Sequence, residues 1–230
     1  MNSQSNRQDD SGQSLFNLAI KFNFYPVRYA HPSWLQKDEN FRVIESLKSD
    51  PAAHFSLSAY LLKKFNLQGA FDFDFGRFDK RVVFASAAEI EQLAFYIGLV
   101  TNEEVIRSVV RREERSALKQ CLGEEAYRFA VKKAQFISRT AVKSGPSILI
   151  DWGNLDRFKA YLISTGQSVM ASAFSDVPEA FRQRLIMKMP RSWQTPLSKP
   201  SDTGLTSPQC ISLLLKTHKE VNRQWRHLLS

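Results

Sequence analysis

The chain has 230 residues, of which 43% are hydrophobic and seventeen are Phe, so it can bury the core of one large domain or of two small ones. No apolar run approaches the roughly 18 residues that cross a bilayer, the polar N-terminus lacks the apolar stretch of a signal peptide, and two distant cysteines make no disulfide framework. These features exclude membrane-spanning and disulfide-stapled secreted proteins and predict a soluble cytoplasmic protein.

The net charge of +9 is concentrated in two regions. Residues 1–102 carry eleven basic and eleven acidic groups, whereas residues 103–143 carry ten against six and residues 182–230 carry nine against two. The intervening residues 144–181 are slightly acidic, with two basic and four acidic groups. Basic regions of this kind attract nucleic acid, anionic membranes or acidic protein partners.

The N-terminal part of the chain predicts a leader followed by an aromatic strap. Residues 1–14 are polar and are predicted to form a disordered leader, and residues 15–230 a single mainly helical domain. Aromatic residues crowd the stretch from 22 to 35, where Pro26 and Pro32 forbid a continuous helix. We therefore expect an extended strap laid over a core.

Two helices and one extended segment come next. A short helix is predicted near 41–47, and Asp50 followed by Pro51 is a good start for a second helix that runs to about Phe65. Phenylalanine and aspartate then alternate, at Phe71, Asp72, Phe73, Asp74 and Phe75. Alternation with period two predicts a short strand or extended segment, and a metal loop would need further ligands that stand at no recognisable spacing.

Helix signals become clear from residue 86. Ser86 with Glu89, and Thr101 with Glu104, each fit a capping box, and Gly98 fits the left-handed position that ends the first of these helices. Another helix is predicted to begin at Gly123, followed by two acids suited to a helix N-terminus. Its expected buried stripe is Ala126, Phe129, Ala130, Phe136 and Ile137.

The C-terminal part continues the helical pattern. Helices are predicted over 155–165, over 169–174 after Gly166, and over 176–189. The stretch 190–208 has four prolines and predicts a loop, after which Ser207 and Pro208 start a final helix. The fold class is mainly α, an irregular helical domain with possible sub-boundaries near 67–85 and 190–207.

The central block leaves two functional interpretations open. A single helix over 103–122 would place Glu113 on the buried side, where an unpaired carboxylate costs several kcal/mol. Either the chain breaks near Arg111–Glu114, or Glu113 is held by an arginine. With a break, residues 86–122 resemble the outline of a helix-turn-helix whose arginines meet phosphates, at Arg107, Arg111, Arg112 and Arg115. The glutamates between them would repel a phosphate backbone.

Signals for catalysis are missing from the sequence. His31, His54, His218 and His227 are scattered, and no Walker, dinucleotide-binding, nucleophile-elbow or paired CxxC motif occurs. We therefore predict that the chain is not an enzyme and binds neither a cofactor nor a metal.

Two motifs together resemble a known family. The first is FNFYPVRYAHPSWL over residues 22–35, and the second is LAFYIGLVTNEEVIRSVVRREERSALKQCLGEEAYRFAVKKA over residues 93–134. The combination resembles the K-type sorting-platform adaptors of bacterial type III secretion systems.

The resemblance implies a cytoplasmic, non-enzymatic adaptor that supports protein secretion at the inner membrane. It would join the forkhead-associated-like cytoplasmic domain of the inner-membrane ring protein to the pod protein of the sorting platform, without nucleic acid and without membrane insertion. The candidate docking or fold-bracing residues are Arg107, Arg111, Arg112, Glu113, Glu114, Arg115, Glu124, Glu125 and Arg128. The candidate strap residues are Arg28, Tyr29, His31, Pro32 and Trp34.

Overall fold

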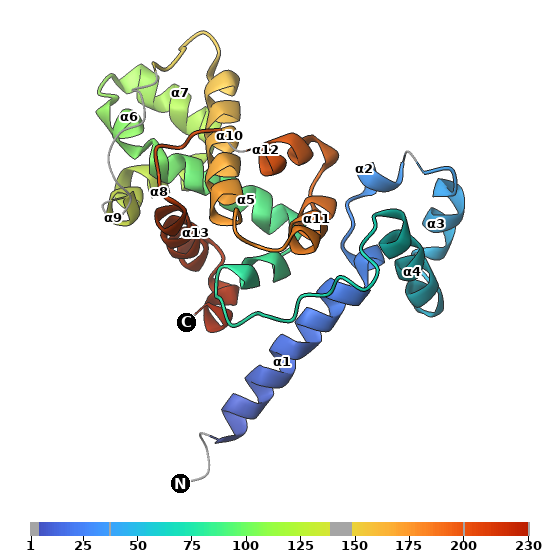
Figure 1. Cartoon of the computed structure of the whole chain (residues 1–230). Coiled ribbons are helices and arrows are strands. Elements are labelled where there is room, and N and C mark those ends of the chain that lie inside the picture. The colour runs from blue at the N-terminus through green and yellow to red at the C-terminus, as the bar shows by residue number, and fades with distance from the viewer. Residues whose placement is uncertain (1–4, 37, 139–148, 200, 230) are drawn as a thin grey trace. The chain divides into compact units, whose positions relative to one another are not determined.

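A computed structural model describes residues 5–36, 38–138, 149–199 and 201–229. Helices joined by short turns make up the fold (Figure 1), and no strand occurs among the described residues. The mainly α prediction is therefore confirmed, and the predicted strand is wrong. Residues 5–14 of the predicted leader lie in the first helix and residues 1–4 lie outside the described residues, so the extent of the leader stays a prediction.

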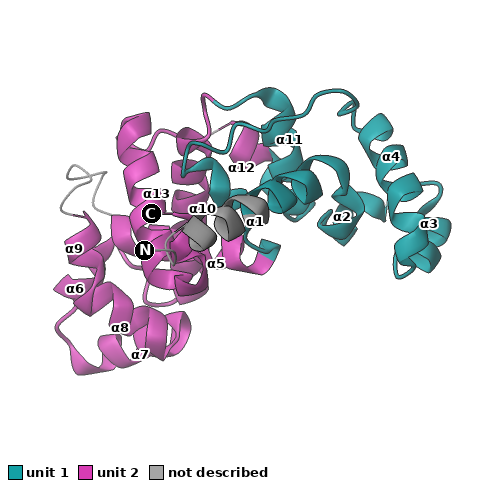
Figure 2. Cartoon of the chain, turned by 90° about the horizontal axis from the view of Figure 1, so that it is seen from below, with its two compact units in different colours: residues 1–87, 177–194 teal, residues 88–176, 195–230 magenta. Residues whose placement is uncertain are grey.

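The chain divides into two compact units (Figure 2). Unit 1 comprises Met1–Ala87 and Val177–Gln194, and unit 2 comprises Ala88–Asp176 and Thr195–Ser230. Unit 1 contains α1 (Ser5–Phe24), η1 (Pro26–Arg28), α2 (Pro32–Leu35), α3 (Phe41–Leu47), η2 (Pro51–Ala53), α4 (His54–Lys64), η3 (Lys80–Phe84), α11 (Glu179–Lys188) and η4 (Arg191–Trp193), where η marks a 3-10 helix. Unit 2 contains α5 (Ala87–Thr101), α6 (Glu103–Ser108), α7 (Arg112–Leu122), α8 (Glu124–Lys132), α9 (Ala134–Ser138), α10 (Leu155–Ala173), α12 (Gln194–Ser198), α13 (Ser207–Val221) and η5 (Arg223–Leu228).

The strap of unit 1 is helical and not extended. Phe22 and Phe24 form the last turn of α1, and Pro26 and Pro32 each stand at the start of a new helical turn. Proline fits a helix start because its missing N–H has no intrahelical acceptor there. The prolines thus break the helix, as predicted, but each break begins another turn. The predicted helices at 41–47 and from Asp50 to about Phe65 are confirmed as α3 and as η2 with α4.

The segment after α4 in which Phe and Asp alternate is held by hydrogen bonds to side chains and does not pair with a strand. Asp72 exchanges two backbone hydrogen bonds with the side-chain amide of Asn23, at 2.7 and 2.9 Å. The amide of Phe75 donates to the carbonyl of Phe73, a tight turn that breaks the pleat of a strand. Phe75 is buried against Phe22, whereas Phe71 and Phe73 stay exposed. All three rings lie against α1, because Phe71 and Phe73 pack on Phe24 with ring centres 4.3 and 6.2 Å away.

Unit 2 is held by a close helix crossing at two glycines. Gly98 and Gly166 were expected to end helices, yet both lie inside α5 and α10, which cross in Figure 1. A Cβ at Gly98 would lie 1.9 Å from the carbonyl oxygen of Leu162, and one at Gly166 would lie 1.8 Å from that of Ala94. The two predictions are wrong because these glycines let the helix backbones touch.

Two other details of unit 2 differ from the sequence predictions. Thr101 does not cap α6, because its hydroxyl donates to the carbonyl of Gly98 at 3.0 Å within α5. Phe136 is 62% exposed, whereas the other four residues of the expected stripe are buried. The register changes at Lys133, where α8 ends and α9 begins, and this change turns the Phe136 ring outward.

Helix starts in unit 2 follow local chemistry more closely. The predicted break in the central block is confirmed, since α6 ends at Ser108 and α7 begins at Arg112. Gly123 stands before α8 with a φ of 91°, a backbone angle that side chains disfavour. The final helix begins at Ser207 and is capped by Thr206 and Gln209. The predicted loop at 190–208 contains η4 and α12.

Candidate docking surfaces and buried charges

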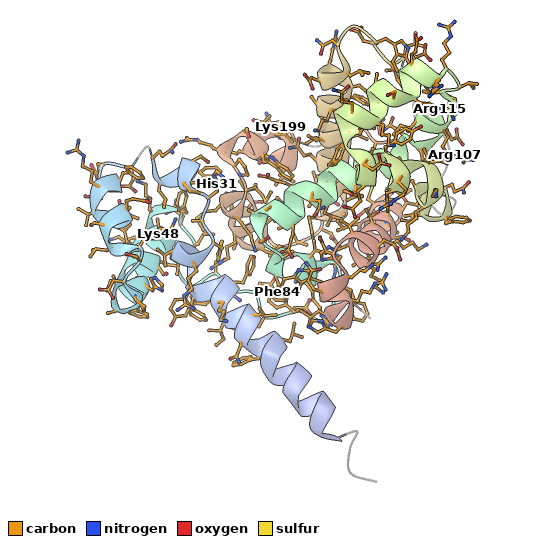
Figure 3. All side chains as sticks on the ribbon, turned by 180° about the vertical axis from the view of Figure 1, so that it is seen from behind. His31, Lys48, Phe84, Arg107, Arg115 and Lys199 are labelled. Atoms are coloured by element: carbon orange, nitrogen blue, oxygen red, sulfur yellow. The ribbon has the colours of Figure 1, made fainter. Side chains whose placement is uncertain are left out.

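The arginines of the central block lie on the surface of unit 2. We define the central face as Arg107 of α6, Arg111 of the turn, and Arg112 and Arg115 of α7, all of which are exposed. Arg107 and Arg115 are labelled in Figure 3. Val110, in the same turn, is 79% exposed. The turn therefore exposes one apolar side chain among arginines that are its neighbours in the sequence.

The acidic partners of the central face are few, and one of them is buried. Arg111 lies 3.5 Å from Glu114, and Arg107 lies 3.2 Å from the buried carboxylate of Glu103. Glu113 is exposed, since the break before α7 removes it from the buried side where a continuous helix would have placed it. The Arg111–Glu114 pair lies at the surface and contributes about 0–1 kcal/mol, which is too little to hold a fold, whereas Arg107 pairs with a buried carboxylate.

The remaining candidate residues of unit 2 lie at the start and on the outer side of α8. Glu124 pairs with Lys119 of α7, and Glu125 and Arg128 are exposed. Arg112, Arg115 and Arg128 make no ion pair with any other described residue. The structure therefore brings α6, α7 and α8 together as one charged surface, with most of its cations available to a partner.

The strap residues of unit 1 connect α1, α4 and α11. The hydroxyl of Tyr29 donates to the carbonyl of Phe22 at 2.8 Å, and the indole N–H of Trp34 donates to the carbonyl of Met189 at 2.8 Å. The Nδ1 atom of His31 accepts from the backbone amide of Ser33 and caps α2, which Pro32 begins. Arg28 donates to the ring of His54 at 3.3 Å.

Burial shapes the chemistry of the strap. It raises the pKa of Tyr29 well above its ordinary value, against an opposing pull from the nearby Arg184 guanidinium. Tyr29 therefore stays a neutral hydrogen-bond donor at any physiological pH. The strap residues brace unit 1, and nothing in their geometry is typical of a catalytic site.

A buried arginine that the sequence analysis missed lies at the centre of unit 1. Arg184 of α11 is 0% exposed and donates to the backbone carbonyls of Ala70 at 2.7 Å, Leu67 at 3.2 Å and Asn23 at 3.4 Å. Burial lowers its pKa, which nevertheless stays far above neutrality. The guanidinium therefore ties two chain segments to α11, the end of α1 at Asn23 and the turn from Leu67 to Ala70, where the carbonyl of Leu67 also accepts from the amide of Ala70.

Two buried lysines reinforce the same core. Lys80 contacts Asp72 at 2.8 Å and Asp74 at 3.4 Å, and its ammonium lies 5.6 Å from the centre of the Phe181 ring. Lys188 donates to the carbonyl of Val83 at 2.7 Å. The two aspartates of the alternating segment are therefore ion-pair partners of a lysine.

A third ion pair in unit 1 involves a buried aspartate. Asp38 accepts hydrogen bonds from Lys64, from the amide of Asn40 and from the hydroxyl of Tyr60. Burial raises the pKa of Asp38, but these hydrogen bonds outweigh it and leave the pKa below its ordinary value. The side chain therefore stays ionised inside unit 1.

Neither a cluster of metal ligands nor a membrane-spanning helix occurs in the part of the chain that the structure describes. No group of three His, Cys, Asp or Glu side chains comes together there in a way that would hold a metal ion. None of the described helices combines the length and the apolar character needed to cross a membrane. Cys121 and Cys210 are unpaired thiols.

Comparisons with known proteins agree with the two sequence motifs. The family model of YOP proteins translocation protein K (YscK) matches residues 18–230. The chain is similar in fold to the cytoplasmic domain of the T3SS sorting platform protein PscK from P. aeruginosa, with 19% sequence identity, a TM-score of 0.53, and coverage of 91% of this chain and 97% of that one. No curated protein sequence matches the chain. Because the family model covers both motifs and almost the whole length, the chain belongs to the YscK family of type III secretion proteins.

Proposed function

We propose that the chain is a non-enzymatic cytoplasmic adaptor of a type III secretion sorting platform. In this role it links the forkhead-associated-like cytoplasmic domain of the inner-membrane ring protein to the pod protein. The observation that carries the proposal is membership in the YscK family over residues 18–230, together with a surface of exposed arginines in a chain that lacks a recognisable catalytic motif.

The central face supports a docking role better than a bracing role. Its arginines are exposed, and the surface pair of Arg111 with Glu114 contributes little to stability. Arg107 is the exception, because it pairs with the buried Glu103. An exposed Val110 within the guanidinium groups matches the make-up of many interfaces, in which an apolar anchor is surrounded by a polar rim. We infer that the central face contacts one of the two partners.

A binding experiment with each partner alone tests the adaptor role. The purified full chain is immobilised, and the ring protein's cytoplasmic domain and the pod protein are applied separately at physiological salt. We expect each to bind without the other. Binding of neither partner by a folded chain would overturn the proposal, and binding of only one would reduce the chain to an accessory of that partner.

The nucleic-acid alternative is tested on the same preparation. A helix-turn-helix protein binds duplex DNA with an affinity that falls steeply as salt rises. Residues 103–115 carry four arginines against four glutamates, a balance that leaves little net attraction for a phosphate backbone. We expect no shift of a duplex at low salt.

A further inference from the structure

A second charged surface of unit 2 lies where α13 meets η5. Lys219 and Glu220 of α13 and Arg226 and His227 of η5 line an open hollow of about 560 Å³. The guanidinium Nε of Arg226 donates to the carbonyl of Lys219 at 2.6 Å, which holds η5 against the end of α13. We call this feature the C-terminal hollow.

Cations outnumber acids in the C-terminal hollow. One carboxylate oxygen of Glu220 lies 3.0 Å from Lys133, the residue before α9, and the other lies 2.9 Å from Arg226. These two cations, together with Arg223, lower the pKa of Glu220. Lys219 lines the hollow, and Arg223 lies at the start of η5, outside the lining but near enough to lower the pKa of Glu220. Neither cation contacts a carboxylate among the described residues.

From this arrangement we infer that the C-terminal hollow binds carboxylate side chains of an acidic segment of a partner protein. Lys219 on the lining and Arg223 beside it supply the cations that a second carboxylate needs. The contacts of Glu220 with Lys133 and Arg226 show that cations at this surface hold a carboxylate at hydrogen-bond distance. The inference assigns a surface and a ligand chemistry separate from the central face, so it goes beyond the proposed function and does not depend on it.

Other anionic partners fit the hollow less well. Among the described residues of α13 and η5, no large hydrophobic side chain is exposed that would anchor the surface in a membrane. The indole of Trp225 is bound to Glu89 at 3.0 Å and is not free to stack on a base. Glu89 and Glu220 also interrupt the positive charge that a continuous phosphate backbone would follow.

The test uses a fluorescent twelve-residue peptide of alternating Asp and Glu, with binding followed by anisotropy on the full chain. Reversing both free cations with Lys219→Glu and Arg223→Glu is expected to weaken binding roughly tenfold or more.

The matched control reverses two exposed arginines elsewhere, with Arg42→Glu and Arg157→Glu, and changes net charge by the same amount. It is expected to weaken binding less than about threefold. An equal loss in both double variants would overturn the proposal, because it would show attraction to net charge alone.

A second variant tests the hollow without removing a cation. Glu220→Gln removes the internal acid that competes for Lys133 and Arg226, so peptide binding should tighten roughly threefold or more. Glu45→Gln, on an exposed position of α3, changes net charge equally and should leave affinity nearly unchanged. Weaker binding by Glu220→Gln, in a chain whose unfolding is unchanged, would contradict the proposal.

Competing partners are outcomes of the same titration. The wild-type chain and the hollow variant are also titrated with a 20-base-pair duplex and with phosphatidylglycerol vesicles. One contrary result is that the duplex or the vesicles bind the wild-type chain more tightly than the peptide does and lose that binding in the Lys219→Glu, Arg223→Glu variant. This result would assign the hollow to that ligand and overturn the proposal. Circular dichroism of each variant confirms folding, and Lys219→Gln with Arg223→Gln replaces the reversal if it fails to fold.

Discussion

The two units of the chain use charge in opposite ways. Among the described residues, unit 1 buries five charged side chains, whereas unit 2 buries one, Glu103. The buried charges of unit 1 are Asp38, Asp79, Lys80, Arg184 and Lys188. Unit 2 keeps its arginines on the surface and is held by helix backbones that touch at Gly98 and Gly166. Cations in a basic chain therefore have two separate uses, and burial distinguishes them.

The comparison bears on the adaptor role that we propose for the chain. Surface charges that contribute little to stability are available to a partner, because their loss leaves the fold intact. Buried cations are not available to a partner protein, because each one donates to carbonyls or carboxylates that would otherwise lack a hydrogen-bond partner. We expect variants of unit 1 cations to lose stability and variants of unit 2 arginines to lose binding.

The largest expected effect is at Arg184. Replacing it with Met should destabilise the protein by about 3–5 kcal/mol, because the carbonyls of Ala70, Leu67 and Asn23 lose their donor inside the core. Urea unfolding measures the loss. Arg112→Met, which removes an exposed guanidinium, should change stability by less than about 0.5 kcal/mol. Equal losses of stability in the two variants would contradict the difference between buried and exposed arginines.

Protonation of His218 in unit 2 is expected to lower the free energy of unfolding by about 3 kcal/mol as the pH falls. Burial lowers the pKa of this residue to about 4, against an opposing pull from Glu89, whereas the unfolded value is 6.5. The unfolded chain therefore binds the proton more tightly, and stability falls as pH drops from 6.5 towards 4.

His218→Gln removes that titration and should flatten the loss of stability between pH 7 and pH 4.5. Asp38 and Glu220, whose pKa values are lowered in the folded chain, also reduce stability towards the acid end of this window, but they do so equally in the wild type and in the variant. Urea unfolding at the two pH values compares wild type with variant. An unchanged slope would show that His218 is accessible to water, contrary to its 1% exposure.

A smaller effect, whose sign is informative, is expected at Gly98. Alanine in an unobstructed helix interior stabilises by about 1 kcal/mol relative to glycine. At Gly98 the added Cβ meets the carbonyl of Leu162, so Gly98→Ala should instead destabilise by about 1–3 kcal/mol. Gly76→Ala, where a Cβ meets nothing nearer than 3.5 Å, is the control. Stabilisation by Gly98→Ala would show that α5 and α10 do not touch there.

Local signals in the sequence predicted much of this fold. The Asp50–Pro51 start, the break before Arg112 and the start at Ser207 depend on residues within one helical turn, and all three are confirmed. The two recognised motifs also led to the correct family. The positions of Gly98 and Gly166 were misjudged, because their role depends on helices that lie far away in the sequence.

The buried charges could not be predicted for the same reason. Arg184 is stabilised by carbonyls from two segments that lie more than 100 residues away in the chain, and no pattern within α11 identifies those acceptors. The one local hint is spacing, since Arg184 and Lys188 lie four apart on one side of a helix that also carries Phe181. The role of the central arginines stays a prediction until partners are tested.

The central claim is that the arginines of unit 2 bind partners while the cations of unit 1 hold the fold. The most direct test is the affinity of Arg112→Glu with Arg115→Glu for the ring protein's cytoplasmic domain and for the pod protein, measured beside urea unfolding of the same variant. We predict unchanged unfolding and at least a tenfold loss for one of the two partners. A folded variant that binds both partners as the wild type does would contradict the account.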